Sequence, residues 1–214
     1  MTAIRLNKMN PKKKLTIIYV LIGVIILCGG FAAFHTIATM NAQRETREQY
    51  ITNVSAASLL ITLSAAQAEE LTGLTSRVWN NAIRNVSHRE TNRFTIRPDR
   101  FIFDDWTYQS NDFVDDFNIA LLRLFFDNDT REVVSAIEDM RDTISDLMRE
   151  LQNPPDELAN VYVTIMELHA AYEGLAGLAI NPTGSLTSFN DSRRGFIDDI
   201  VRLYRRLQVE MPNE

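Results

Sequence analysis

Residues 129–151 read DTREVVSAIEDMRDTISDLMREL, and their apolar side chains recur at the spacing of a helix that packs along one face. Six apolar positions follow one another in steps of 4, 3, 4, 3 and 4 residues: Val133, Ile137, Met140, Ile144, Leu147 and Leu151. Such an unbroken heptad seam is typical of a helix packed against near-parallel neighbours. Asp129 and Glu132 stand at capping-box spacing, so we expect this helix to begin there.

Further helices are predicted on both sides of this seam. A helix from about Asn111 to Phe126 precedes it and is ended by Asp127-Asn128-Asp129. Pro154 and Pro155 open a following helix that runs to about Ile180. Its inward positions are expected to be Leu158, Val161, Ile165, Leu168, Tyr172, Leu175 and Ala179.

The last predicted helix lies beyond a turn. The sequence Asn181-Pro182-Thr183-Gly184 has the residues that favour a turn and should close the preceding helix. A helix from about Asn190 to Val209 follows, and one of its faces is expected to hold Phe196, Ile200, Leu203 and Leu207.

The amino-terminal part of the chain predicts a membrane anchor. Leu15 to Phe34 forms twenty consecutive uncharged residues, LTIIYVLIGVIILCGGFAAF. At about 1.5 Å of rise per residue, such a helix crosses a hydrocarbon core of roughly 30 Å. Three of the four lysines directly precede it, which favours a cytoplasmic amino terminus. We therefore predict a single-pass signal anchor in the cell membrane; a cleaved signal peptide, with Leu15–Cys28 as its apolar region, is the alternative.

A second uncharged stretch, Gln49 to Ala68, is interpreted as a helix buried by protein rather than by lipid, because Asn53, Gln67 and several Ser and Thr dilute it. No Gly or Pro occurs between Phe31 and Leu71. We therefore expect one long helix that reaches to about Asn85 and is interrupted at most near Gly73.

The predicted fold class is all-α, a single transmembrane helix that continues into an extracytoplasmic up-and-down helical bundle. The expected parts are a short basic cytoplasmic tip (1–14), the transmembrane helix (15–34), a long stalk that is also the first bundle helix (35–87), an Arg/aromatic connecting loop (88–110), the remaining bundle helices (111–209) and a tail (210–214).

The charges are unevenly distributed along the 214 residues. Residues 1–14 hold five Lys and Arg and no acid, whereas the remaining 17 Lys and Arg face 28 Asp and Glu, a net charge of −11. Such a body repels nucleic acid, so no nucleic-acid partner is expected. Cys28 is the single cysteine, so the outer body is expected to hold together without a disulfide, which favours a bacterial protein.

The residues that carry chemistry form no recognisable catalytic or metal-binding motif. His88 and His169 are the histidines of the outer body, and Glu167, His169 and Glu173 lack the spacing of a di-iron bundle. Asp127-Asn128-Asp129 lacks the later ligands of a calcium loop. We therefore expect no enzymatic activity, no bound metal and no cofactor.

The segment from Arg77 to Tyr108 is the candidate binding region, because it holds six arginines, two tryptophans and three phenylalanines. Arg and Trp dominate binding hot spots, and Arg holds carboxylates with two hydrogen bonds. The candidate ligand- or partner-binding residues are Trp79, Arg89, Arg93, Arg97, Arg100 and Trp106. The alternative is a loop held on the bundle by its own aromatic residues.

These features favour a non-catalytic, membrane-anchored interaction protein or accessory subunit. Its expected partners are the lipid bilayer and either another protein or a second copy of the chain. The layout is similar in outline to the sensory half of bacterial chemoreceptors, which implies a bundle that binds a small ligand and signals through a membrane partner. Those receptors return through the membrane, whereas we expect this chain to end outside at Glu214. A hydrolytic enzyme is the third and least favoured hypothesis.

Overall fold

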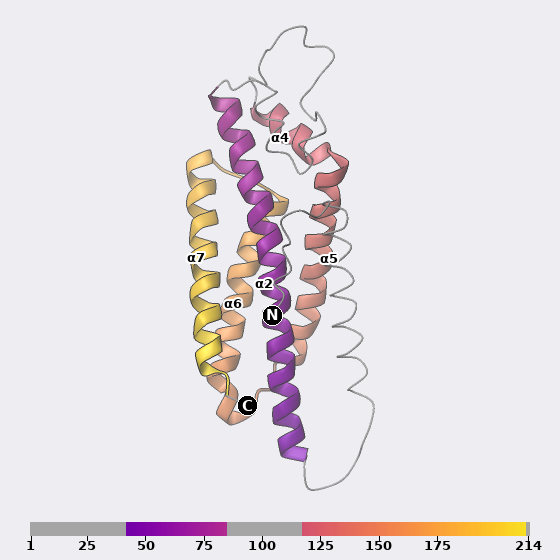
Figure 1. Ribbon diagram of the computed structural model, residues 1–214, viewed down its shortest axis with the longest axis vertical. Helices are drawn as coiled ribbons and strands as arrows, with labels where there is room; N and C mark the ends of the chain where they lie inside the picture. Colours follow the sequence, from indigo (N-terminus) through magenta and orange to yellow (C-terminus); the bar gives the residue numbers. More distant parts are fainter. Residues whose placement is uncertain (1–41, 85–116, 213–214) are drawn as a thin grey trace, which may run out of the picture. The chain divides into compact units, whose positions relative to one another are not determined.

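The computed structural model describes residues 42–84 and 117–212, and within these ranges it contains helices, their connections and no strand. The elements are α2 (Ala42–Ile83), α4 (Phe117–Phe126), α5 (Asn128–Glu150), the short 3-10 helix η2 (Asp156–Leu158), α6 (Ala159–Ile180) and α7 (Leu186–Glu210). The four long helices lie side by side (Figure 1). The all-α prediction is therefore confirmed for this part of the chain.

Several predicted parts lie outside the described residues. They are the basic tip (1–14), the transmembrane helix (15–34), both ends of the stalk (35–41 and 85–87), the Arg/aromatic loop (88–110), the first residues of the helix predicted from Asn111 (111–116) and the end of the tail (213–214). These remain predictions from the sequence.

α2 is a continuous helix of 42 residues that passes Gly73 without a break, as predicted. Its inner side is buried at Val54, Ala57 and Ile61. Among the described residues, Arg47–Ile83 is the one helix long and apolar enough to cross a membrane, and 44% of its most apolar window is buried inside the protein. One side of this helix therefore belongs to the protein core.

Hydrogen bonds tie α2 to the other long helices at three levels. They join Tyr50 OH to the carbonyl oxygen of Leu151 at 3.2 Å, Ser64 Oγ to Tyr172 OH at 2.8 Å, and Ser76 Oγ to Asn190 Oδ1 at 2.6 Å. Near its carboxyl end α2 also packs on α4 through an apolar cluster of Leu74, Val78, Ala82, Ala120 and Leu124. α2 therefore contacts the core along its length, from Tyr50 to Ala82.

The heptad seam of α5 and its C-cap is confirmed at four of its six positions. Ile137, Met140, Ile144 and Leu151 are buried, whereas Val133 and Leu147 are partly buried. Met148, the neighbour of Leu147, is buried as well. The core-facing side of α5 is therefore the predicted one, with Met148 as an additional core residue.

All seven positions predicted to face inward are buried. Six of them lie on α6, and Leu158 directly precedes it. The predicted turn after α6 is also present: α6 ends at Ile180, and Gly184 adopts a φ of +89°, which favours glycine. The spacing of apolar residues and the turn residues were therefore sufficient to place this helix.

Three helix starts differ from the predictions. α6 begins at Ala159, four residues after Pro155, because the 3-10 helix Asp156–Leu158 comes first. The other two starts differ at their caps. α5 begins at Asn128 because Asp127, not Asp129, is its N-cap and accepts hydrogen bonds from the backbone N–H groups of Asp129 and Thr130. α7 begins at Leu186, four residues before the predicted Asn190, because Ser185 forms a capping box with Ser188. In both cases a side-chain oxygen satisfies backbone donors that the helix leaves unpaired.

α6 and α7 pack closely against each other. Gly174 permits this approach, since a Cβ atom there would lie 2.3 Å from Cε1 of Phe196 on α7. Gly177 has no such role, because a Cβ atom there would meet nothing within 4 Å. One of these two helix glycines therefore has a packing reason and the other does not.

Candidate functional site

Of the six predicted binding residues, the structure describes only Trp79, and it places this side chain in the core. Trp79 lies on the inner side of α2, where it is 4% exposed and packs against Phe189 of α7 with ring centroids 5.7 Å apart. The other five, Arg89, Arg93, Arg97, Arg100 and Trp106, lie outside the described residues. Trp79 therefore contributes to the contact between α2 and α7.

A polar cluster lies between the helices and consists of Ser64, Arg141, His169, Tyr172 and Glu173. Its strongest contact joins α5 to α6: Arg141 donates to Glu173 from Nε at 3.2 Å and from a terminal guanidinium nitrogen at 2.5 Å. This hydrogen bonding raises the pKa of Arg141. The Glu173 carboxylate is thus committed to an ion pair, which the sequence pattern did not indicate because the two residues lie 32 positions apart.

His169 is the second member of the cluster and lies one helical turn before Glu173. Its Nε2 is 3.8 Å from Oε1 of Glu173, too far for a hydrogen bond, and this buried atom has no hydrogen-bond partner. Burial lowers the pKa of His169, which outweighs the opposing effect of the Glu173 carboxylate. The side chain is 17% exposed, so a neutral, partly buried structural histidine fits its surroundings.

Tyr172 and Ser64 connect the cluster to α2. Their hydroxyl groups are fully buried and lie 2.8 Å apart. Burial raises the pKa of Tyr172 to about 12, so its hydroxyl keeps its proton at neutral pH. The pair serves as a hydrogen bond across the core rather than as an acid or a base.

An open cavity of about 480 Å³ borders this cluster on the side of α5. It is lined by Glu138, Asp139, Arg141, Asp142, Ser145 and Glu173. In the described ranges no group of three or more His, Cys, Asp or Glu side chains is placed to hold a metal ion. The cavity is therefore bordered by solvated carboxylates of α5 and by the Arg141–Glu173 ion pair, which joins α5 to α6.

The outer face of α2 is the other distinctive surface. We call its five positions Thr52, Ala56, Leu59, Leu63 and Ala66 the outer seam; they follow one another in steps of 4, 3, 4 and 3 residues on the side away from the core. Leu59 is 42% exposed and Leu63 is 36% exposed. No charged residue occurs from Gln49 to Ala68. α2 thus has two heptad patterns. One is buried in the core, and the outer seam is the other.

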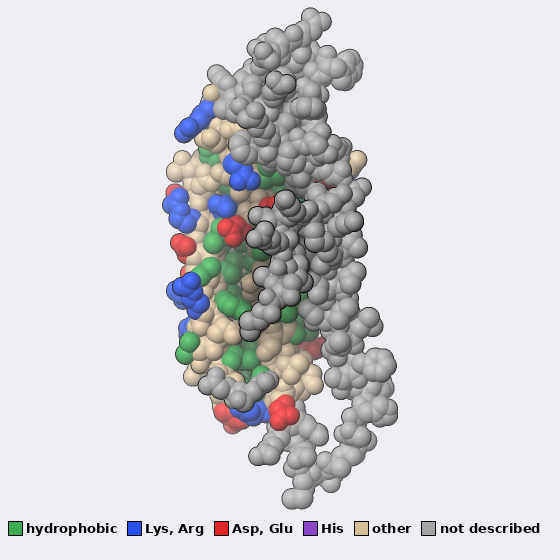
Figure 2. Space-filling view, viewed as in Figure 1, with side chains coloured by type: hydrophobic (Ala, Val, Ile, Leu, Met, Phe, Trp, Pro, Cys, Tyr) green, Lys and Arg blue, Asp and Glu red, His purple; other side chains and the backbone are tan. Residues whose placement is uncertain are grey.

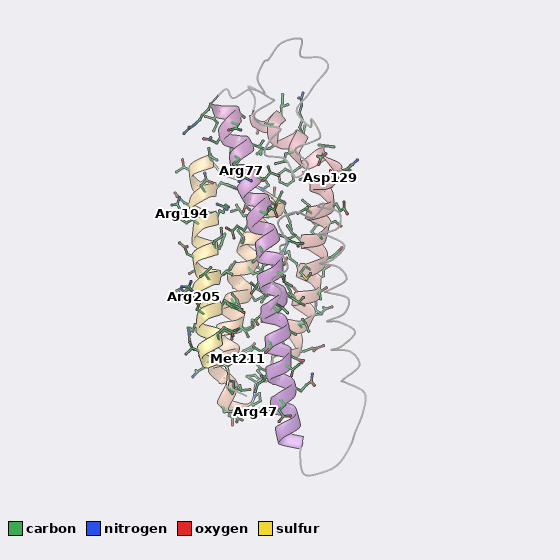
Figure 3. The ribbon with its side chains drawn as sticks, in the orientation of Figure 1. Arg47, Arg77, Asp129, Arg194, Arg205 and Met211 are labelled. Atoms are coloured by element: carbon green, nitrogen blue, oxygen red, sulfur yellow. The ribbon has the colours of Figure 1, made fainter. Side chains whose placement is uncertain are left out.

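The surface of α7 contrasts with this seam. Arg194 and Arg205 point away from the other helices (Figure 3). Arginine side chains gather along the edge that α7 forms, whereas hydrophobic and uncharged side chains occupy the middle of the same view (Figure 2). Charge is therefore abundant along α7 (Figure 2), whereas the outer seam of α2 carries none.

No family model, curated protein or solved structure matches this chain.

Proposed function

We propose that this chain is a single-pass membrane protein that acts without catalysis, as an accessory or interaction subunit. Its amino terminus lies in the cytoplasm, residues 15–34 span the membrane, and the up-and-down helical bundle outside docks on a protein surface. One observation carries the proposal: α2, the helix nearest the predicted span, exposes the uncharged outer seam while its other side is buried in the core.

The position of α2 supports an anchored bundle. Only seven residues separate the predicted end of the span at Phe34 from Ala42, where the description of α2 begins. At about 1.5 Å per residue, 42 helical residues extend about 63 Å. A helix of this length offers an extended docking surface beyond the predicted span.

The polar cluster supports a role without catalysis. Glu173 is held by Arg141, and Tyr172 pairs with Ser64 and keeps its proton. A general acid or base needs a pKa near the working pH. The pKa of Tyr172, raised to about 12, lies far above it, and the Glu173 carboxylate is paired with Arg141, so helix packing accounts for both groups.

The membrane part of the proposal is tested by fractionation and by a topology reporter. The full-length chain, with alkaline phosphatase fused after Glu214, is expressed in a bacterial host, where this enzyme is active only outside the cytoplasm. We expect the fusion to resist carbonate extraction and to be active. A chain that begins at Ala42 is the control and should be extracted. An inactive full-length fusion, or one that carbonate releases, would refute the anchor or its orientation.

The binding part is tested by cross-linking in native membranes, followed by mass spectrometry. Arg93→Ala combined with Arg97→Ala should weaken capture of the partner, because arginine contributes strongly to hot spots. The control is Arg194→Ala combined with Arg205→Ala, which removes two arginines from the exposed edge of α7. Equal capture by the two double variants would remove the Arg/aromatic loop from the proposal.

A further inference from the structure

We propose that two copies of this chain associate side by side through the outer seam of α2, as a parallel pair of helices. This inference rests on the proposed membrane anchor and names the docking surface and its occupant. It starts from the pattern of the seam, whose steps of 4, 3, 4 and 3 residues match the contacts between two near-parallel helices.

The seam has the chemistry of a helix contact and not of a solvated face. Leu59 and Leu63 are exposed large apolar residues, while Ala56 and Ala66 are small enough to let a second helix approach closely. Charged residues stand only at its two ends, at Arg47 and Glu48 before it and at Glu69 and Glu70 after it. The uncharged part therefore has defined limits along α2.

A second copy is the occupant that this charge pattern fits. In a two-fold symmetric pair of parallel helices each seam residue faces its own copy, so any charge on the seam would meet a like charge. The seam carries none, although residues 15–214 have a net charge of −11. The outer face of α5 is the opposite case, since it holds exposed Glu138, Asp139 and Asp142. Two copies that met through α5 would repel each other.

The chain before α2 supplies the parallel arrangement. Seven residues join the predicted span to Ala42, so two copies in one membrane send α2 outward in the same direction and at the same height. Anchoring also raises the effective concentration of each seam for the other. A contact of five small and medium-sized side chains is therefore sufficient in the membrane although it would be weak between free chains.

Disulfide cross-linking of the full-length protein in its native membranes tests the proposal. The single cysteine is first removed by Cys28→Ser, and Leu59→Cys or Leu63→Cys is then introduced. Mild oxidation should give a band at twice the 24.5 kDa mass of the monomer. Val163→Cys is the matched control, because Val163 is 47% exposed and apolar but lies on α6. It should give no such band.

A second pair of variants guards against chance collisions. Leu59→Glu with Leu63→Glu places like charges opposite each other in the parallel pair, so co-purification of two differently tagged copies should be lost. Val163→Glu with Met166→Glu adds the same charge to exposed positions of α6 and should leave co-purification unchanged. Circular dichroism of each variant checks that it remains helical.

The possible failures are distinguishable. Cross-linking at Leu59 no stronger than at Val163, or co-purification that survives the two α2 glutamates, overturns the self-association. A mixed disulfide between Leu59→Cys and a different protein also overturns it, but leaves the proposed interaction function standing. Release of the unmodified protein by carbonate refutes the anchor and with it the proposed function.

Discussion

α2 and α5 each bury one apolar seam in the same core, yet their opposite faces differ in kind. α5 has seven acidic and three basic residues among its 23, and its outer face is charged along its length. α2 has no charge over the twenty residues from Gln49 to Ala68, and its outer face exposes Leu59 and Leu63. An amphipathic helix needs only one apolar side to join a bundle. The second uncharged side of α2 is therefore not required by the fold.

Burial in the core accounts for one side of each helix and leaves the opposite side to be explained separately. α5 packs into the core through its inner seam, and its other face is charged and exposed. α2 also packs into the core and keeps a further surface free of charge. Exposed apolar residues that line up along one helix indicate a contact more strongly than the same residues scattered singly.

The largest expected effect compares the two sides of α2. Ile61 is fully buried, so Ile61→Ala should lower the free energy of unfolding by about 3 kcal/mol, from lost burial and the cavity left behind. Leu59→Ala on the outer seam should cost about 0.5 kcal/mol. Urea unfolding of the full-length protein in detergent micelles, at dilution that disfavours association, measures both. Equal losses would show that the two sides do not differ.

The next largest effect compares two glycines of α6, one that faces α7 and one that faces open space. Gly177→Ala should stabilise the protein by about 0.5 to 1 kcal/mol, because Ala favours helix over Gly and the site is open. Gly174→Ala gains the same propensity but displaces the Phe196 ring, and it should be less stable than Gly177→Ala by about 2 kcal/mol. The melting temperatures of the two variants give the comparison, which a similar rise at both positions would contradict.

A smaller effect concerns the start of the charged helix. Asp127→Ala removes the N-cap of α5 and should cost about 1 kcal/mol, whereas Asp127→Asn keeps an accepting oxygen and should cost less. The same denaturation experiment compares the two variants. Equal losses would mean that the Asp127 charge, rather than its hydrogen bonds to the backbone, supports this helix end.

The smallest expected effect is a pH dependence of the protein's stability, caused by His169 of α6. Burial lowers the pKa of His169 from its ordinary value of 6.5, so the folded protein favours the neutral ring. Below about pH 6.5 the unfolded chain takes up a proton that the folded state resists, and stability falls as the pH decreases from 7 toward 5. Above about pH 7 the ring is neutral in both the folded and the unfolded chain, so His169 no longer makes the stability depend on pH.

His169→Gln isolates this contribution, since it removes the titrating ring but keeps a polar side chain. The stability difference between wild type and the variant should be constant above pH 7 and should change between pH 7 and 5 in the direction that favours the variant. A constant difference over the whole range would show that His169 titrates alike in the folded and unfolded chains.

Most of the described helices were predictable because their signals are local. Pro154 and Pro155, the turn before Ser185 and the spacing of apolar residues along α6 each act within a few residues. The errors fell at helix ends, where several polar residues compete as caps. Asp127 and Ser185 were chosen over their neighbours by backbone geometry, which spacing alone does not contain.

The candidate site was less predictable because its contacts are not local. Arg141 and Glu173 belong to different helices, and Tyr172 meets Ser64 across 108 positions of sequence. The aromatic content around Trp79 indicated a binding surface, but the rotation of α2 places this ring against Phe189 in the core. Composition alone does not report which side of a helix a residue occupies.

The helical class, the order of the helices and the uncharged character of Gln49–Ala68 were all predictable from the chain, because periodicity, helix breakers and charge are properties of neighbouring residues. Which of the two uncharged sides of α2 is buried, and which carries the outer seam, depends on the packing of the folded protein. Both sides have heptad-like spacing, so that choice depends on the helices packed against α2 and on the hydrogen bonds from Ser64 and Ser76 that orient it.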